Sequence, residues 1–162
     1  MNLVRRSGSY ADGCYATVFF VDDTAIKVFK RRGDVPPNHV RDVFCSEDEA
    51  YRYSANRSEI CHYTNHFIGV KVVCMIKDET GRDISHEYHP EFAYEMERLA
   101  GEPVKVGALD SESAQHIQGL FRSAGVRHMR DCSVFLDQAG ELANVIDFAM
   151  QEYELQVEDE LL

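Results

Sequence analysis

Apolar and polar residues alternate near the start of the chain in a way that predicts a β-hairpin. Residues 18–21 form a short apolar run, residues 22–23 are a tight-turn pair of aspartates, and residues 25–30 alternate with period two. In that alternation Lys27 lies on the face opposite the apolar residues that flank it. Upstream, residues 11–16 form a loop rich in small residues. The pattern therefore predicts a hairpin that follows a small-residue loop.

The remaining apolar pattern predicts two helices and further strands. A helical spacing covers about 38–56, and a second helix to about residue 124 can be capped by Asp110 or Ser111 and ended by Gly125. Strand-like segments are expected at 67–76, 92–99, 133–137 and 142–146. This order predicts an α+β fold whose front half is rich in strands.

Composition narrows the class of protein. The chain has 162 residues, 44% of them hydrophobic, which suits one domain with a substantial core. Its net charge of −11 argues against a nucleic-acid partner, because phosphate backbones favour clustered Lys and Arg. No apolar run reaches the roughly 18 residues of a membrane helix, and no secretory signal is visible. The five cysteines form no CxxC pair, which indicates reduced thiols in a cytoplasmic setting.

Three features then follow one another in an order that suggests phosphate chemistry. The small-residue loop precedes a strand lysine, Lys27, and the later strand-like run Val-Ile-Asp-Phe-Ala carries Asp147. Phosphoryl transfer needs backbone amides over the phosphates, a cation on their oxygens and a carboxylate for Mg²⁺. A carboxylate between apolar residues also needs a partner or a metal. We therefore expect a nucleotide-binding cleft between Lys27 and Asp147.

In these features the chain resembles the protein-kinase-like superfamily. The pattern Gly-x-Gly-x-x-Gly-x-Val falls on residues 11–18, where Gly13 is the middle glycine, Ala16 replaces the last glycine and Val18 is retained. The run Ala-Ile-Lys that ends at Lys27 matches the Val-Ala-Ile-Lys strand. The resemblance implies that these four residues contact ATP.

The same resemblance assigns roles to further residues. The Glu-x-x-Ala-Tyr pattern of small kinases makes Glu47 the expected ion-pair partner of the strand lysine, with Glu49 as the alternative. A stretch resembling a gatekeeper strand and hinge contains Glu97 and Leu99, which would contact the nucleotide's adenine. Asp147 stands at the aspartate of Asp-Phe-Gly and would bind Mg²⁺.

The catalytic loop departs most from the family pattern. Residues 133–140 align with Asn-Ile-Leu-Val-Asp-x-x-Gly, so that Ser133 replaces a metal-binding asparagine. The loop before it is shortened. One register makes Asp131 the carboxylate that orients the acceptor hydroxyl or takes its proton, and His128 a structural histidine. An ungapped register puts His128 at the base position instead, and the sequence leaves both open.

The resemblance implies a minimal bilobal kinase-like domain. Residues 1–99 would form a strand-rich N-lobe with the hinge, and residues 100–162 a strongly reduced C-lobe with an acidic tail. The 15 residues after Asp147 leave no room for an activation segment or a peptide-docking lobe. In this the chain is similar to the minimal kinase effectors that pathogenic bacteria inject into host cells through type III secretion.

This similarity implies an ATP- and Mg²⁺-dependent Ser/Thr protein kinase that acts on a folded host protein. Ubiquitin-conjugation machinery and an Hsp90-type chaperone are the partners it suggests, and the expected location is the bacterial cytoplasm with export to the host. The lost glycines, Ser133 and Ala149 favour an alternative, a pseudokinase that binds nucleotide and a partner protein without transferring phosphate. A small-molecule phosphotransferase is disfavoured, because the chain cannot hold a large helical substrate lobe.

Overall fold

The computed structural model describes residues 1–151 and has a mixed α+β architecture, which confirms the predicted α+β class. The acidic tail expected at 152–162 lies outside the described residues. The centre of the fold is a five-stranded antiparallel sheet in the order β2-β3-β4-β7-β5. Its strands are β2 (Tyr10–Asp12), β3 (Ala16–Val21), β4 (Thr24–Lys30), β7 (Tyr88–Glu97) and β5 (Phe67–Lys71).

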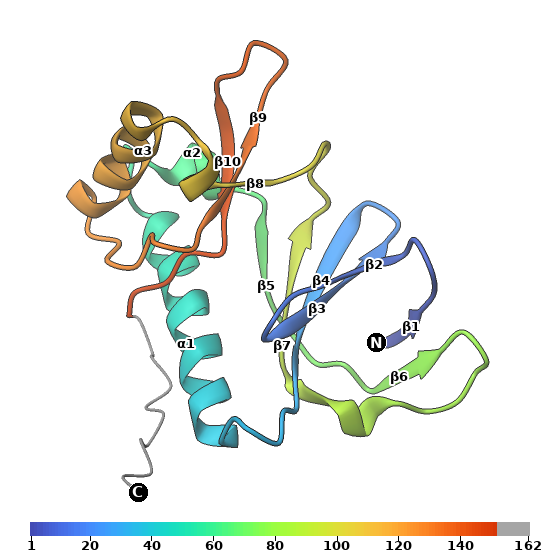
Figure 1. Ribbon diagram of the computed structural model, residues 1–162. Coiled ribbons are helices and arrows are strands. Elements are labelled where there is room, and N and C mark those ends of the chain that lie inside the picture. Colours follow the sequence, from blue (N-terminus) through green and yellow to red (C-terminus); the bar gives the residue numbers. More distant parts are fainter. Residues whose placement is uncertain (152–162) are drawn as a thin grey trace, which may run out of the picture.

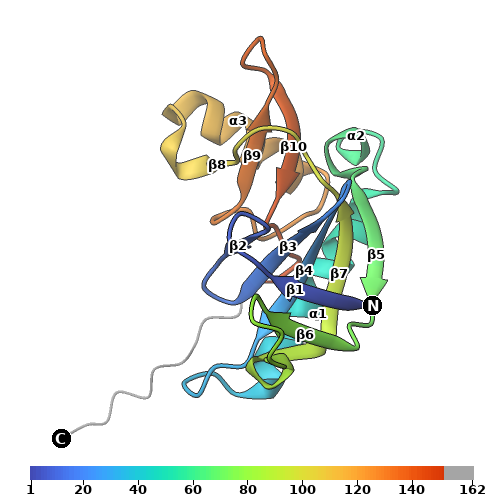
Figure 2. The ribbon, with the colours of Figure 1, turned by 90° about the vertical axis from the view of Figure 1, so that its right-hand side faces the viewer.

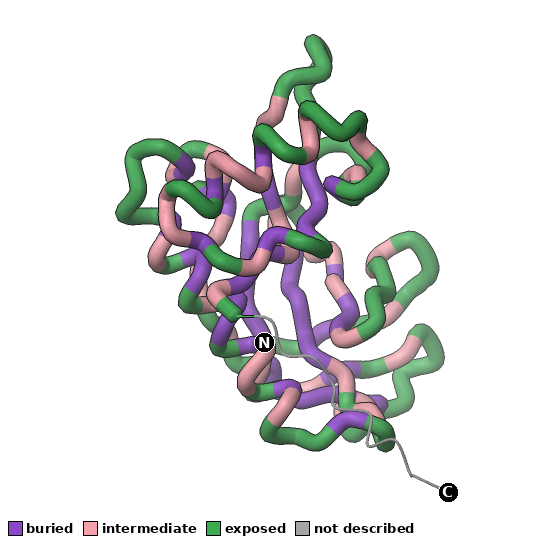
Figure 3. Tube along the Cα trace, turned by 60° about the vertical axis from the view of Figure 1, so that its left-hand side comes forward, coloured by how far each residue is buried: buried purple, intermediate pink, exposed green. Residues whose placement is uncertain are grey.

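Helix α1 (Pro37–Ser54) packs along one face of this sheet, which we call the inner face (Figure 1). A proline at the first helical position suits the helix start, because its missing N–H has no partner there in any case. Apolar residues of α1 are buried at helical spacing. Figure 3 shows that buried stretches run through the middle of the molecule, whereas the outer loops are exposed. The buried residues include Val40, Phe44, Ala50 and Tyr51.

The opposite, outer face of the sheet is covered by two short parallel strands. Strand β1 (Asn2–Arg5) pairs with β6 (Met75–Asp78), and a 3₁₀ turn η1 (Ser85–Glu87) follows (Figure 2). Together they bury a second apolar cluster against the sheet. Its members are Leu3, Phe19, Ile26, Val28, Val73, Ile76, Ile84, Tyr88 and Ala93.

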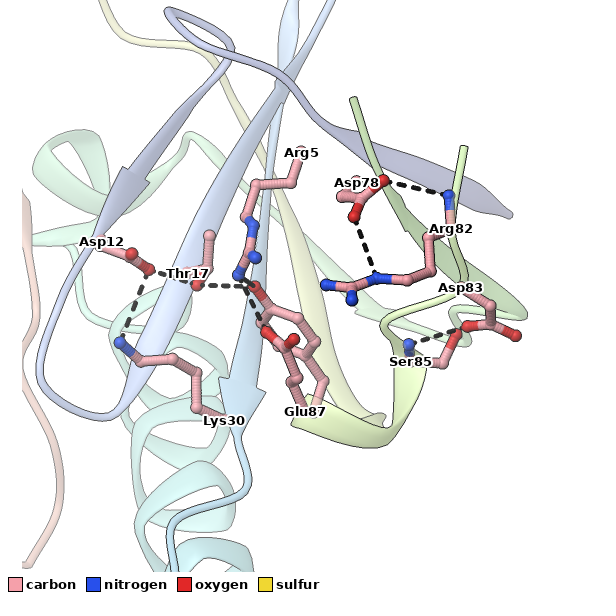
Figure 4. Close-up of polar contacts among 10 residues, drawn as sticks. Arg5, Asp12, Thr17, Lys30, Asp78, Arg82, Asp83, Ser85 and Glu87 are labelled. Carbon is pink, nitrogen blue, oxygen red and sulfur yellow. Dashed lines mark hydrogen bonds and ion pairs between the residues drawn. The ribbon is translucent and has the colours of Figure 1, made fainter. Parts of the chain in front are cut away.

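A chain of polar contacts borders this outer cluster (Figure 4). Arg5 donates to the hydroxyl of Tyr88 at 3.2 Å, and that hydroxyl lies 3.3 Å from the hydroxyl of Thr17. Thr17 in turn donates to the carboxylate of Asp12, which also pairs with Lys30 at 3.5 Å. The network therefore connects β1 to the end of β2, where the small-residue loop begins.

The rest of the chain forms a small third sheet with helices beside it. The sheet has the order β10-β9-β8, with β8 (Val104–Lys105), β9 (Ser133–Leu136) and β10 (Leu142–Ile146). The helical segments are α2 (Cys61–Thr64), the 3₁₀ turn η2 (Val106–Ala108) and α3 (Ser111–Ser123). Asp110 caps α3, as the sequence predicts, by accepting from the Ser113 amide. Within residues 1–151 no helix has the length and apolar character needed to cross a membrane.

Two predicted elements differ from the structure. The expected strand 67–76 is divided into β5 and β6, because the chain leaves the main sheet between them: the Val73 amide still donates to Pro90 of β7, whereas the next amide, that of Cys74, donates to Met1. The expected strand 92–99 begins earlier and ends earlier, as β7. Strand β1 was not predicted as a separate element, because its partner β6 lies some 70 residues away and gives no local signal.

Candidate functional site

Lys27 lies in the middle of β4 with its side chain on the inner face. Its register partners are Val18 on β3 and Tyr94 on β7, and residues opposite one another in a sheet share a face. The apolar neighbours Ile26 and Val28 belong to the outer cluster. The alternation of β4 therefore directs the lysine toward α1, as the sequence predicts.

Glu47 of α1 is the partner of this lysine. Lys27 Nζ donates to Glu47 Oε2 at 2.7 Å, and the hydroxyl of Tyr94 donates to the same oxygen at 2.6 Å. The two charged side chains are 10% and 12% exposed, so they compensate one another in a largely buried position. The alternative partner, Glu49, is a solvent-exposed residue of α1.

Asp147 follows β10 and approaches Lys27 from the other side. Its Oδ1 lies 3.2 Å from Lys27 Nζ, and its Oδ2 lies 3.7 Å from Lys105 Nζ. The Asp147 backbone has a φ of 59°, a left-handed conformation that few residues other than glycine adopt, although aspartate tolerates it better than most. Lys27 of β4 and Lys105 of β8 thus meet at one half-buried carboxylate, that of Asp147, which contacts both ammonium groups.

Burial and charge act in opposite directions on the ionisation of these groups. Burial alone would lower the pKa of Lys27, but the carboxylates of Glu47 and Asp147 raise it above the ordinary value. Burial would raise the pKa of Asp147, but Lys27, Lys105 and the Ser133 side chain hold it below the ordinary value. Both groups are therefore charged at neutral pH.

The residues after Asp147 are held by packing and backbone hydrogen bonds. Phe148 is fully buried, and its ring lies 4.5 Å from that of Tyr51 and 5.4 Å from that of Phe121. The amide of Ala149 donates to the His128 carbonyl at 3.0 Å, and the His128 amide donates back to Ala149 at 2.9 Å. The aromatic contacts join α1 to α3 and fix the position from which Asp147 projects.

The predicted loop is shorter than the sequence pattern indicates. Gly13 lies between β2 and β3, where its amide donates to the Ala16 carbonyl and a side chain would come within 3.3 Å of that oxygen. Ala16 is the first residue of β3 and is buried, so it belongs to the core beneath the loop. Val18, two residues on, faces the same side as Lys27. The structure brings this loop and the lysine to one face of the sheet.

The two expected hinge residues lie at the end of β7. Glu97 is the last residue of the strand and is exposed, and its amide donates to the His66 carbonyl at 2.8 Å. Leu99 is half-buried in the connection that follows. They are next to Met96, whose sulfur accepts from the hydroxyl of Tyr51 at 3.8 Å. The connection therefore runs beside the inner core.

The three predicted residues of the shortened catalytic loop, His128, Asp131 and Ser133, differ in their burial and contacts. Asp131 is exposed, and its carbonyl accepts from Lys105 Nζ at 2.8 Å. His128 is half-buried, and its backbone forms the bridge to Ala149. Ser133 is buried at the start of β9, where its side chain contributes to lowering the pKa of Asp147. The Ser133 side chain therefore interacts with Asp147.

Two residues of this site, Lys105 and Tyr94, were not predicted from the sequence. Lys105 lies in a two-residue strand after a proline, where no repeating pattern marks it. Tyr94 is a core aromatic by its spacing, but its hydroxyl donates to a carboxylate. The period-two alternation of β7 would have placed Tyr94 opposite Lys27, provided the register of the two strands had been known.

The protein oxygen atoms around Asp147 can bind Mg²⁺ only together with oxygen atoms of a bound molecule, such as nucleotide phosphates. Mg²⁺ in nucleotide sites usually takes one or two carboxylates and completes its shell with phosphates and water. The Asp147 carboxylate is such a donor, and the Ser133 hydroxyl beside it is a second, weaker oxygen donor. Across residues 1–151 no group of three or more His, Cys, Asp and Glu could hold a metal without further ligands.

Comparison with known proteins does not extend this description. No protein-family model matches the chain, and searches of curated proteins and of solved structures found no match either.

Proposed function

We propose that the chain is a minimal kinase-like domain that binds ATP with Mg²⁺ and transfers the γ-phosphate to a Ser or Thr of a folded protein. The observation that carries the proposal is the simultaneous contact of Lys27 with Glu47 at 2.7 Å and Asp147 at 3.2 Å. A strand lysine paired with a helix glutamate and facing a metal-binding aspartate is the arrangement that kinase phosphate sites need. The proposed N-lobe and hinge are residues 1–99, and the reduced C-lobe begins at residue 100.

Each residue has a role in this mechanism. Lys27 holds the α- and β-phosphates, Glu47 fixes its ammonium group, and Gly13 lets the loop approach the phosphates. Asp147 and Ser133 would hold Mg²⁺, which supplies charge neutralisation at the phosphate oxygens. Val18, Glu97 and Leu99 would surround the adenine.

The transfer step forms a bond between the acceptor hydroxyl oxygen and the γ-phosphorus. The bond from that phosphorus to the β–γ bridging oxygen breaks, and ADP leaves. Asp131 orients the hydroxyl and accepts its proton. Asp131 is preferred to His128 for this role because its side chain is exposed to an incoming acceptor, whereas His128 is half-buried.

A second candidate function is a pseudokinase that binds nucleotide and a partner protein without catalysis. The observation that favours it is the position of Lys105, whose ammonium group lies 3.7 Å from the carboxylate oxygen expected to bind metal. Resemblance to minimal secreted effectors suggests host partners for either function, with the ubiquitin-conjugation machinery or an Hsp90-type chaperone as candidates.

Radiolabel transfer separates the two functions. The protein is incubated with Mg²⁺ and γ-labelled ATP, alone and with host-cell lysate, beside Lys27→Ala, Asp147→Ala and a control, Lys77→Ala, that changes an exposed lysine of β6. A kinase labels protein in the wild type and the control only. ATP-dependent thermal stabilisation without transfer supports the pseudokinase, and the absence of any thermal shift contradicts both functions.

A further inference from the structure

Lys105 is a second cation at the candidate site, and nothing in the sequence pattern assigns it. It lies on β8, directly opposite Ser133 on β9, so the two side chains share a face of the small sheet. Its ammonium group donates to the Asp131 carbonyl at 2.8 Å and lies 3.7 Å from Asp147 Oδ2. The lysine therefore spans the space between the proposed acceptor-orienting residue and the proposed metal-binding carboxylate.

The backbone around Lys105 is fixed, whereas its side chain is accessible. Val104 and Lys105 pair with β9, and the amide of the following residue, Val106, donates to the Cys132 carbonyl at 3.0 Å. Val106 itself is fully buried. The Lys105 side chain is nevertheless 63% exposed. An anchored strand thus carries an ammonium group that can move among nearby acceptors.

The two lysines that contact Asp147 differ in how firmly they are held. Lys27 is 10% exposed and has two carboxylate partners at 2.7 and 3.2 Å. Lys105 has one carboxylate partner, at 3.7 Å and open to solvent, and such exposed pairs contribute little to stability. A phosphate group can therefore take Lys105 from Asp147, because a doubly charged oxyanion is a stronger partner for an ammonium group than a single carboxylate.

We propose that Lys105 is the cation that contacts the terminal phosphate of the nucleotide and thereby distinguishes ATP from ADP. The inference rests on the proposed nucleotide site. Lys27, which lies deeper, contacts the inner phosphates that both nucleotides share. Lys105 lies on the exposed side of Asp147, next to Asp131, where the transferred group must meet its acceptor. It supplies positive charge at the place where negative charge moves during transfer.

Calorimetric titration tests this assignment without depending on catalysis. ATP and ADP are titrated, each with Mg²⁺ and with EDTA, into wild type, Lys27→Met, Lys105→Met, Lys105→Arg and the control Lys77→Met. Removing one charge-assisted phosphate contact is expected to weaken ATP binding about tenfold in Lys105→Met and to leave ADP binding within about twofold. The loss is expected to be larger in EDTA, and Lys105→Arg should retain most of the ATP preference.

The outcomes separate the inference from the proposed function. If Lys105→Met changes ATP and ADP affinity by the same factor, or changes neither, while Lys27→Met weakens both, the site stands and the role of Lys105 is wrong. If wild-type protein binds neither nucleotide, the proposed function is wrong and this inference fails with it. Thermal melts without ligand verify that the Lys105 variants are folded, which their exposed position leads us to expect.

Discussion

The two faces of the central sheet are formed by alternate residues of the same strands, yet one face buries a charged group and the other buries an apolar cluster. On the inner face Lys27 is enclosed by Glu47, Tyr94 and Asp147. On the outer face Ile26 and Val28 are fully buried in an apolar cluster. The difference shows that a charge is accommodated in this interior only where opposite charges and hydrogen-bond donors meet it. Loss of a partner should therefore affect the inner face more than loss of apolar volume affects the outer face.

The largest expected effect comes from removing Glu47. Glu47→Leu leaves Lys27 with one carboxylate instead of two and leaves the Tyr94 hydroxyl without its acceptor. We expect the free energy of unfolding to fall by about 3–5 kcal/mol, the range for a broken buried pair. Urea unfolding measures it, with the exposed Glu49→Leu as a control that should change little. A loss below about 1 kcal/mol would contradict the comparison.

An apolar truncation on the outer face should affect stability alone. Ile76 of β6 is fully buried in the outer cluster, and Ile76→Ala leaves a cavity there. We expect a loss of about 3 kcal/mol in the free energy of unfolding. Nucleotide affinity, measured on the fraction that remains folded, should stay within about twofold, since the sheet separates this cluster from Lys27. A strong loss of affinity would show that the two faces are coupled.

His66 is an exception on the inner side, because it is buried without a compensating partner. Among the described residues neither of its ring nitrogens has a hydrogen-bond partner, and burial lowers the pKa of the ring to about 4. The unfolded chain takes up this proton below an ordinary pKa of about 6.5. Stability from the neutral ring is therefore complete above that pH and is lost as the pH falls toward 4.

This loss should reach about 3 kcal/mol at pH 4, from the difference between the two pKa values. Urea unfolding between pH 4 and 7 measures it as the difference in slope between wild type and His66→Leu. The variant should also be slightly more stable at pH 7, because a buried ring without partners is replaced by an apolar side chain. His62→Leu, at an exposed position, is the control. Identical slopes in wild type and His66→Leu would refute the assignment.

The smallest expected effect comes from the hydroxyl of Tyr94. Tyr94→Phe keeps the ring that packs against Tyr51 and Phe44 but removes the 2.6 Å hydrogen bond to Glu47. We expect a loss of about 1–2 kcal/mol in the free energy of unfolding. ATP affinity should fall by a few-fold, because Glu47 is less firmly oriented toward Lys27. Phe44→Leu serves as a packing control, which should lower stability without a comparable loss of affinity.

Local patterns predicted the parts of the site that lie on regular elements. Period two placed Lys27 on the inner face, and the helical segment placed Glu47 on α1. The contacts of Lys105 depend instead on a two-residue strand whose pairing with β9 joins segments far apart in sequence. Strand β1 was missed for the same reason. What the sequence could not supply was the long-range register, since alternation indicates which face a residue takes but not which strand lies opposite.

The left-handed backbone of Asp147 sets stability against function at one position. Glycine adopts a φ of 59° without strain, so Asp147→Gly should relax the turn after β10 by up to about 1 kcal/mol while removing the carboxylate that both lysines contact. Because the exchange also takes one of the two carboxylate partners from Lys27, it stabilises the fold only together with an apolar replacement of that lysine, and both exchanges remove phosphate contacts. Thermostabilised variants of this protein are best screened with nucleotide affinity as a second criterion.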